Sequence, residues 1–474
     1  MKFHPPELSG GTPRGGTMPE TENIRLMGTD PAKAIRVMTI PLIFAFLLSS
    51  VQIYIDSFWC AGLGNDANSS INIAGPVYWV ILDIGAGLGV GVSTAISRAL
   101  GAKEHKRANS LASQAFVLIL LVSVVSGALM YLCARPLVSF TSGGLNVELS
   151  MEYLTPYLIC SFFLMMNGII LGMLRAEGEA RKSSALSIIA SLINIVMDPI
   201  LIYIIGWGLS GAAWATCLSY IATTGAGLYL YLAHKQFVKP VFRHFRFIKE
   251  QLWDIFRVGI PHALELAVIP LLMIPQNSLV VRIGGTDGMI TYSLPYRYIS
   301  LAIVPVQAIA AAMIPVVSYA TGEKDMKKAL FGINYSAKLI VKVSLVFTVI
   351  LLLFATPFSY AFTYEETMVQ FRSEIAMVIR IYGLALLAIA MIELCSSILQ
   401  TLCFAQLATV TMFTRELVFL GLFYIATFFD MTAIYWSLDI AEVVGAAMMA
   451  LCARYAIRQA VRKYGLGGSE APAA

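Results

Sequence analysis

The chain has 474 residues, of which 58% are hydrophobic and 13% are charged, and its mean hydropathy is +0.76. Because soluble globular chains carry roughly 25% charged residues, this composition excludes an ordinary soluble enzyme. The formal net charge of +5 does not require a nucleic-acid partner, since the Lys and Arg residues fall in loops, where basic residues orient a membrane protein.

The two ends of the chain have no features of a targeting sequence. The first residues are rich in Gly, Pro and Thr and lack the basic start and apolar core of a signal peptide. The last residues, from Gly465 onward, are similarly small and polar. We expect disordered tails at 1–30 and 461–474.

Between these tails, long apolar stretches recur along the chain and are separated by short polar loops. An α-helix of about 20 apolar residues crosses a hydrocarbon layer of roughly 30 Å. The pattern therefore predicts an all-α integral membrane protein with about twelve spanning helices. The expected spans are 36–61, 74–98, 111–133, 153–174, 184–205, 211–233, 257–283, 288–319, 332–356, 376–402, 408–430 and 435–457.

Positive charge is concentrated in alternate loops. The opposite loops carry mostly acids, such as Asp66, Glu148 and Asp287. Since loops rich in Lys and Arg stay on the cytoplasmic side, we expect both termini to be cytoplasmic and the number of spans to be even. The basic clusters lie at 25–36, 103–107, 181–182, 235–249, 324–328 and 458–463.

The chain also repeats itself. The segment Ser97–Lys103, at the end of the second expected helix, is similar to Ser318–Lys324 at the end of the eighth. Six helices therefore correspond to six others in the same orientation. Parallel repeats of this kind usually enclose a binding site that alternating access exposes to each side of the membrane, which favours a secondary transporter. The expected parts are a first lobe at 31–233, a basic linker at 234–256 and a second lobe at 257–460.

Polar residues inside the first lobe are the strongest functional signal, because a carboxylate at mid-bilayer costs at least about 2.5–3.5 kcal/mol. Asp56 lies in the first helix. Asn194 and Asp198 are four residues apart on one face of the fifth helix, next to Pro199, which can loosen the backbone. Thr216 is within reach if the fifth and sixth helices form a hairpin. Two carboxylates, an amide and a hydroxyl suit Na⁺ or shared protons.

Each of these residues also has a purely structural interpretation. Asp56 could be solvated near the outer interface, and Asp198 could cap a helix break at Pro199. Thr216 could bond the backbone of its own helix, as membrane threonines commonly do. From the residues alone, these alternatives stay open.

The second lobe does not repeat the cluster in sequence. Gln276 falls where Asp56 would map, and the segment 423–427 of the eleventh helix has no acid, so we expect the ion site to be confined to the first lobe. Glu265 and Glu393 lie in the seventh and tenth helices, with Arg297 and Arg415 as candidate counter-charges. These groups could line a substrate cavity or form buried pairs. The candidate cavity residues are Gln52, Asn167, Gln276, Glu265, Arg297 and Glu393.

No catalytic motif is evident. The glycine run Gly85–Gly91 superficially resembles a nucleotide-binding loop, but it lies inside an apolar helix, with no strand before it and no Lys after it. Close helix packing is the better explanation. There is no HExxH motif, no P-loop and no Asp-rich prenyl-diphosphate motif. We therefore expect neither an enzyme nor a cofactor.

Five stretches carry a family likeness: Ile55–Trp59, Ile96–Ala102, Leu174–Gly178, Asn194–Pro199 and Gly206–Thr216. Over its membrane part the sequence resembles the multidrug and toxic compound extrusion (MATE) transporters, and its fifth helix resembles the branch named after the DNA-damage-inducible protein F. The resemblance implies a V-shaped fold and efflux of organic cations and other amphipathic compounds, driven by inward H⁺ or Na⁺ in a prokaryotic plasma membrane, by a monomer without cofactors. It also implies a coupling site, with a candidate Na⁺ position, at Asp56, Asn194, Asp198 and Thr216.

A flippase for lipid-linked or other amphipathic substrates is the closest alternative. Its cavity should be strongly cationic in order to receive a pyrophosphate. Arg residues inside the expected spans are few compared with the acids, which disfavours this alternative. A membrane-embedded enzyme or channel would need a metal or nucleophile cluster, or a polar stripe along a pore, and neither is evident.

Overall fold

The computed structural model describes residues 20–142, 145–233, 235–243, 245–363 and 366–465, and this part of the chain is helical, without strands. A π-helical turn, Ile200–Ile204, follows the helix that ends at Pro199, and a 3₁₀ turn, Glu366–Phe371, precedes the helix that begins at Arg372. In chain order the helices are α1 (Glu22–Thr29), α2 (Pro31–Ala61), α3 (Asn65–Gly101), α4 (His105–Ser142), α5 (Val147–Ile159), α6 (Ser161–Ala176), α7 (Ala180–Pro199), α8 (Gly208–Leu232), α9 (Lys249–Gly322), α10 (Met326–Phe362), α11 (Arg372–Thr401), α12 (Ala405–Ala426) and α13 (Met431–Tyr464).

The prediction of about twelve spans is confirmed. Nine of the described helices are long and apolar enough to cross a membrane, and α5 with α6, bent by 52° at Cys160, make a tenth span. Helix α9 has 74 residues, several times the roughly 20 that one crossing needs, and Gly285 interrupts it with φ 58°, so α9 holds two spans. Helix α8, with 25 residues, is also long enough to cross.

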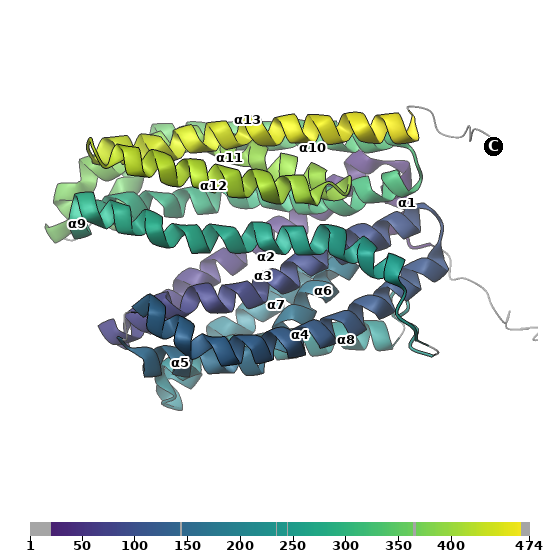
Figure 1. The fold of residues 1–474 in the computed structure, drawn as a ribbon, viewed down its shortest axis with the longest axis horizontal. Coiled ribbons are helices and arrows are strands. Elements are labelled where there is room, and N and C mark those ends of the chain that lie inside the picture. Colours follow the sequence, from purple (N-terminus) through teal and green to yellow (C-terminus); the bar gives the residue numbers. More distant parts are fainter. Residues whose placement is uncertain (1–19, 143–144, 234, 244, 364–365, 466–474) are drawn as a thin grey trace, which may run out of the picture.

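The helices form two lobes that meet in a V (Figure 1). The first lobe contains α2 to α8, and the second lobe contains α9 to α13. Helix α3 packs along α9 at the end of the molecule where Lys103, Lys182 and Lys324 lie, which we call the basic end. Away from the basic end the two groups of helices diverge.

The glycine run of α3 lets three helices approach closely, as the sequence indicates. A Cβ atom on Gly89 would lie 2.3 Å from the carbonyl oxygen of Gly168 on α6, within the first lobe. A Cβ atom on Gly87 would lie 2.5 Å from the backbone nitrogen of Ala263 on α9, across the seam between the lobes. Because lipid tails are as apolar as Leu, helices in a membrane associate through such close contacts rather than through the hydrophobic effect.

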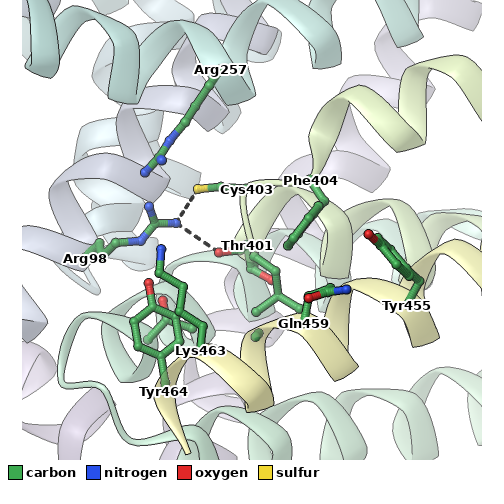
Figure 2. A pocket seen from close by; sticks show the side chains of 12 residues that line it. Arg98, Arg257, Thr401, Cys403, Phe404, Tyr455, Gln459, Lys463 and Tyr464 are labelled. Carbon is green, nitrogen blue, oxygen red and sulfur yellow. Dashed lines mark hydrogen bonds between the residues drawn. The ribbon is translucent and has the colours of Figure 1, made fainter. Parts of the chain in front are cut away.

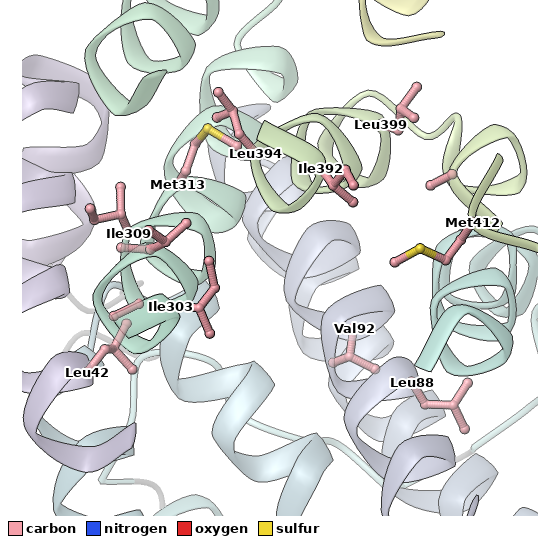
Figure 3. Close-up of a cluster of buried hydrophobic side chains, with 14 of the residues drawn as sticks. Leu42, Leu88, Val92, Ile303, Ile309, Met313, Ile392, Leu394, Leu399 and Met412 are labelled. Carbon is pink, nitrogen blue, oxygen red and sulfur yellow. The ribbon is translucent and has the colours of Figure 1, made fainter. Parts of the chain in front are cut away.

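Apolar side chains from both lobes fill the seam beside these glycines (Figure 3). Leu88 and Val92 of α3 are 3% and 0% exposed, so almost no lipid reaches this part of the seam. The other labelled side chains come from α2, α9, α11 and α12. They are Leu42, Ile303, Ile309, Met313, Ile392, Leu394, Leu399 and Met412.

Three expected boundaries differ from the structure. Helix α1 occupies Glu22–Thr29, inside the expected tail at 1–30, because Thr21 caps it and Ile24 and Met27 are fully buried. Helix α9 begins at Lys249, within the expected linker, and α13 continues to Tyr464. The remaining parts of the expected tails, 1–19 and 466–474, lie outside the described residues.

Candidate functional site

The four predicted coupling residues meet in the first lobe, between α2, α7 and α8. Asn194 and Asp198 are 0% and 1% exposed. The amide oxygen of Asn194 faces the Thr216 hydroxyl at 3.1 Å, and the amide nitrogen donates to Asp56 Oδ1 at 2.8 Å. The Thr216 hydroxyl also lies 3.3 Å from the Ala212 carbonyl of its own helix, so it has an acceptor there as well. This amide orientation satisfies both ends of the Asn194 side chain, so Asn194 joins α2 to α8. We call Asp56, Asn194, Asp198 and Thr216 the coupling cluster.

The two carboxyl groups of the coupling cluster are in contact. Asp56 and Asp198 lie within hydrogen-bonding reach of each other, and Gln52 of α2 also bonds Asp56. The second carboxyl oxygen of Asp198, Oδ2, is buried without a hydrogen-bond partner among the described residues. Two touching carboxylates cannot both ionise cheaply in a low-dielectric site, so this pair is suited to sharing a proton or binding a cation.

A break in α7 positions these groups. Pro199 ends the α-helix directly after Asp198, and Ile200–Ile204 continues as a π-helical turn. Proline has no N–H to donate, and single π turns are common at functional sites. Gly211 of α8 packs on the backbone of this turn, where a Cβ atom would lie 2.7 Å from the Leu201 carbonyl. The close approach brings Thr216 beside Asn194, as the expected hairpin requires.

Of the expected cavity residues in the first lobe, only Gln52 touches the coupling cluster within the part of the chain that the structure describes. Asn167 of α6 is 5% exposed and donates to Thr223 of α8 at 3.1 Å. It therefore ties two helices inside the first lobe rather than reaching Asp56.

The second lobe contains a buried polar network that differs from the expectation. Gln276 of α9 donates to Glu416 of α12 at 3.1 Å. Arg415 donates to Glu442 of α13 at 2.9 and 3.1 Å and also pairs with Glu416. The expectation that Arg415 compensates Glu265 or Glu393 is therefore wrong, because its ion-pair partners are Glu416 of α12 and Glu442 of α13.

This network lies at positions related to the coupling cluster by the repeat. When Ser97–Lys103 is aligned with Ser318–Lys324, Gln276 falls at the position equivalent to Asp56, within one residue, and Arg415 falls at the position equivalent to Asn194. Segment 423–427 of α12 has no acid, as expected from the sequence, but Glu416, seven residues before this segment on the same helix, supplies an acid to the network.

Sequence reasoning missed several acids of the second lobe. Asp439 is 6% exposed, and its Oδ1 atom has no hydrogen-bond partner among the described residues. Glu416 and Glu442, which pair with Arg415, were also missed. The signal that identified Asp56, an acid inside an apolar span, was present for all three.

Glu265 has a serine and a histidine as partners rather than an arginine. Ser396 donates to its Oε1 atom at 2.6 Å, and His262 lies 3.2 Å from its Oε2 atom. Glu393 lies in the same neighbourhood on α11. The guanidinium of Arg297 lies 5.8 Å from the ring centre of Tyr54, on the other lobe. Glu265 and Glu393 thus form one polar patch, and Arg297 belongs to the seam between the lobes.

Known proteins resemble this chain in sequence and in fold. A family model described as MatE matches residues 41–200 and 261–425. The chain belongs to the MatE family. Its curated relatives include the multidrug export protein MepA of Staphylococcus aureus (strain MRSA252), 23% identical over 440 residues and covering 90% of this chain and 94% of the relative. Another is the FAD transporter of Shewanella oneidensis, 24% identical over 324 residues, or 67% of this chain and 71% of the relative.

Solved MATE structures share the fold of this MatE chain. A crystal structure of MATE in complex with MaL6 is 29% identical, has a TM-score of 0.88, and covers 93% of this chain and 100% of its own. A transporter of the MOP superfamily from Pyrococcus furiosus is 28% identical, also with a TM-score of 0.88, covering 93% of this chain and 99% of its own. The MatE chain is thus a multi-pass membrane transporter and not an enzyme, and its V-shaped fold is confirmed.

Within the described residues, no group of three or more His, Cys, Asp or Glu side chains could hold a metal ion. The coupling cluster instead offers two carboxylates, one amide and one hydroxyl. Oxygen ligands of this kind suit a monovalent cation or a proton shared between the acids.

Proposed function

We propose that this MatE transporter is an antiporter that exports small organic cations and other amphipathic compounds in exchange for H⁺ or Na⁺. The observation that carries the proposal is the contact between Asp56 and Asp198, held by Asn194. The pair joins α2 to α7, so a change in its charge acts directly on the position of α2. The name of the relative MepA supports a drug-like substrate.

In this mechanism, the entering cation neutralises the Asp56 and Asp198 pair and α2 rearranges, which releases the exported compound. The cation must bind one conformation more tightly than the other, because only differential affinity shifts a conformational equilibrium. Each inward charge also contributes about 2.3 kcal/mol per 100 mV of membrane potential, which adds to the concentration gradient.

The proposed orientation places the basic end and both termini in the cytoplasm of a prokaryotic cell. The alternation of basic and acidic loops supports it. In this orientation the structure is closed toward the cytoplasm, since Gly101 and Gly322 pack the lobes together at the basic end. The end at which the lobes diverge then faces the outside of the cell, where an exported compound is released.

The experiment is dye transport in proteoliposomes with a pH gradient or a Na⁺ gradient imposed separately. Wild type is compared with Asp56→Asn and Asp198→Asn, and the control Asp66→Asn changes an exposed acid at the start of α3. Antiport predicts that one gradient drives dye movement in wild type and the control, and that neither site variant responds. If neither gradient moves dye, while wild type and both site variants translocate labelled phospholipid equally, the flippase alternative replaces antiport.

A further inference from the structure

A cavity lies at the basic end, and none of its lining residues belongs to the coupling cluster. The cavity, of about 400 Å³, opens between the end of α3, the turn from α11 to α12, and the last turns of α13 (Figure 2). Arg98 comes from the first lobe, whereas Arg257, Gln459 and Lys463 come from the second. Residues of both lobes therefore line the cavity.

The cavity has an excess of positive charge. Arg98, Arg257 and Lys463 line it, and its lining contains no carboxylate from the described residues. Of the three cavity cations, Arg257 pairs with an acid, Asp254, at 2.8 Å, and Asp254 also pairs with Arg107 at 2.7 Å. Glu104 also pairs with Arg107, at 2.9 Å, so these two carboxylates balance Arg107 and Arg257. The charges of Arg98 and Lys463 have no ion-pair partner among the described residues.

The cavity cations also retain hydrogen-bonding capacity. Arg98 donates to the Thr401 carbonyl and to the Cys403 sulfur through the same nitrogen, Nη2. Arg257 Nε is buried without a partner, and Lys463 has no ion pair, both within the part of the chain that the structure describes. Guanidinium and ammonium groups have only donors, so a ligand that satisfies them must be an acceptor.

We propose that this cavity binds a phosphate-bearing anion, either a lipid headgroup or a free phosphate. A phosphate group presents several charged acceptor oxygens, and arginine matches this geometry with two parallel hydrogen bonds. The wall of the cavity includes Phe404 and Tyr455, whose rings are 6.3 Å apart. Tyr455 is 52% exposed and Leu451, one turn earlier on α13, is 68% exposed, so an apolar surface leads from the lipid side to the cavity.

Binding here stabilises the closed basic end. The Arg98 contacts with Thr401 and Cys403 connect α3 to the turn between α11 and α12, so they must break when the lobes separate at this end. A phosphate held by Arg98 together with Lys463 would bridge the same gap. Such a ligand binds the closed conformation more tightly than the open one, and it shifts the population toward the closed state.

The test uses the full-length protein in a neutral detergent. Phosphatidylglycerol and phosphatidylcholine are titrated and measured by native mass spectrometry, while inorganic phosphate and pyrophosphate are measured by calorimetry. The pocket variants are Lys463→Gln alone, at an exposed position that folding tolerates, and Lys463→Gln combined with Arg257→Gln. The matched control combines Arg458→Gln with Arg462→Gln, which removes two exposed charges of α13 outside the cavity.

The expected result is a loss of about tenfold in phosphatidylglycerol affinity for each pocket charge removed, which corresponds to about 1.4 kcal/mol, because each removed cation takes away a charged hydrogen bond to the phosphate. The control keeps the wild-type affinity. Binding of pyrophosphate with the same variant pattern, but no preference for phosphatidylglycerol over phosphatidylcholine, identifies a soluble phosphate as the source. Equal losses in pocket and control variants, or no binding of any phosphate ligand beyond that of phosphatidylcholine, overturn the proposal.

The conformational step has its own measurement. Spin labels at Lys106 of α4 and Lys327 of α10, both exposed near the basic end, report the separation of the lobes in a Cys133→Ser background. The phosphate ligand should narrow the distance distribution toward the closed state in wild type and leave Lys463→Gln unchanged. A ligand that binds without changing the distribution contradicts the stabilisation of the closed end. Neither the binding measurement nor the distance measurement depends on transport. Phosphate binding can therefore be confirmed or refuted whether or not the antiport proposal holds.

Discussion

Gly101 of α3 lies directly against the main chain of Tyr319 on α9, where a Cβ atom would be only 2.0 Å from the Tyr319 carbonyl oxygen. The same relationship recurs with the roles of the lobes exchanged, because a Cβ atom on Gly322 would be 2.1 Å from the carbonyl oxygen of Arg98. The repeat in the sequence makes Gly101 equivalent to Gly322 and Arg98 equivalent to Tyr319. The sequence repeat therefore produces a symmetric crossing of α3 and α9, and this crossing closes the basic end.

Replacing Gly322 by Ala should open or weaken this crossing. A methyl group cannot fit against the Arg98 carbonyl, so α3 and α9 must move apart, and overpacking of this kind typically costs about 1–3 kcal/mol. We expect a lower apparent melting temperature in detergent. Gly421→Ala is the control, since no atom lies within 4 Å of the added methyl group in α12. The control should melt at or above the wild-type temperature, because Ala favours helix by up to about 1 kcal/mol. If Gly322→Ala and Gly421→Ala had the same melting temperature, the close packing of α3 against α9 at Gly322 would be contradicted.

The coupling cluster was largely predictable from the sequence, whereas the second-lobe network was not. Asn194 and Asp198 are four residues apart in one helix, and helical geometry alone places them on a common face. The partner of Arg415 depends on which face of α12 meets α13, and no local pattern specifies this. The break of α9 at Gly285, in contrast, was predicted, because it lies between the expected spans 257–283 and 288–319.

Thr216→Val tests whether the hydroxyl belongs to the coupling cluster or only to its own helix. Valine keeps the shape but leaves the Asn194 amide oxygen without its side-chain partner, a loss of about 1 kcal/mol, or several-fold in affinity. We expect the half-maximal concentration of the driving cation in transport to rise several-fold. Thr39→Val is the matched control, because the Thr39 hydroxyl bonds its own helix, at Ile35. Identical transport by the two variants would favour the structural interpretation of Thr216.

Arg415→Met should destabilise the second lobe strongly. Arg415 is 8% exposed and pairs with both Glu416 and Glu442, so its loss leaves two acids facing each other in the interior. Breaking a buried pair by removing one partner costs about 3–5 kcal/mol. Arg135→Met is the control, since its pair with Glu148 is exposed and worth at most about 1 kcal/mol. Denaturation curves should separate the two variants, and matching curves would mean that the network carries little stability.

Glu177 should make stability depend on pH near neutrality. This residue lies in the turn between α6 and α7, outside the spans, and burial raises the pKa of its carboxyl to about 7, although Tyr231 and the backbone of Phe237 and Val238 donate to it. A carboxyl group that holds its proton more tightly in the folded state than in the unfolded state stabilises the fold at low pH. This contribution is lost as the pH rises from the ordinary carboxyl range through about 7.

Replacing Glu177 by Gln isolates that effect, because Gln keeps the acceptor oxygen for the backbone of Val238 and cannot ionise. The wild-type melting temperature should fall between pH 5 and pH 8 by more than that of the variant, since about 1.4 kcal/mol accompanies each unit of pKa difference. Glu104→Gln, an exposed acid in the turn between α3 and α4, is the control and should retain the wild-type slope. If the melting temperatures of Glu177→Gln and wild type changed with pH in parallel over this range, Glu177 would be ionised throughout it. The proton on Glu177 would then contribute no stability to the turn.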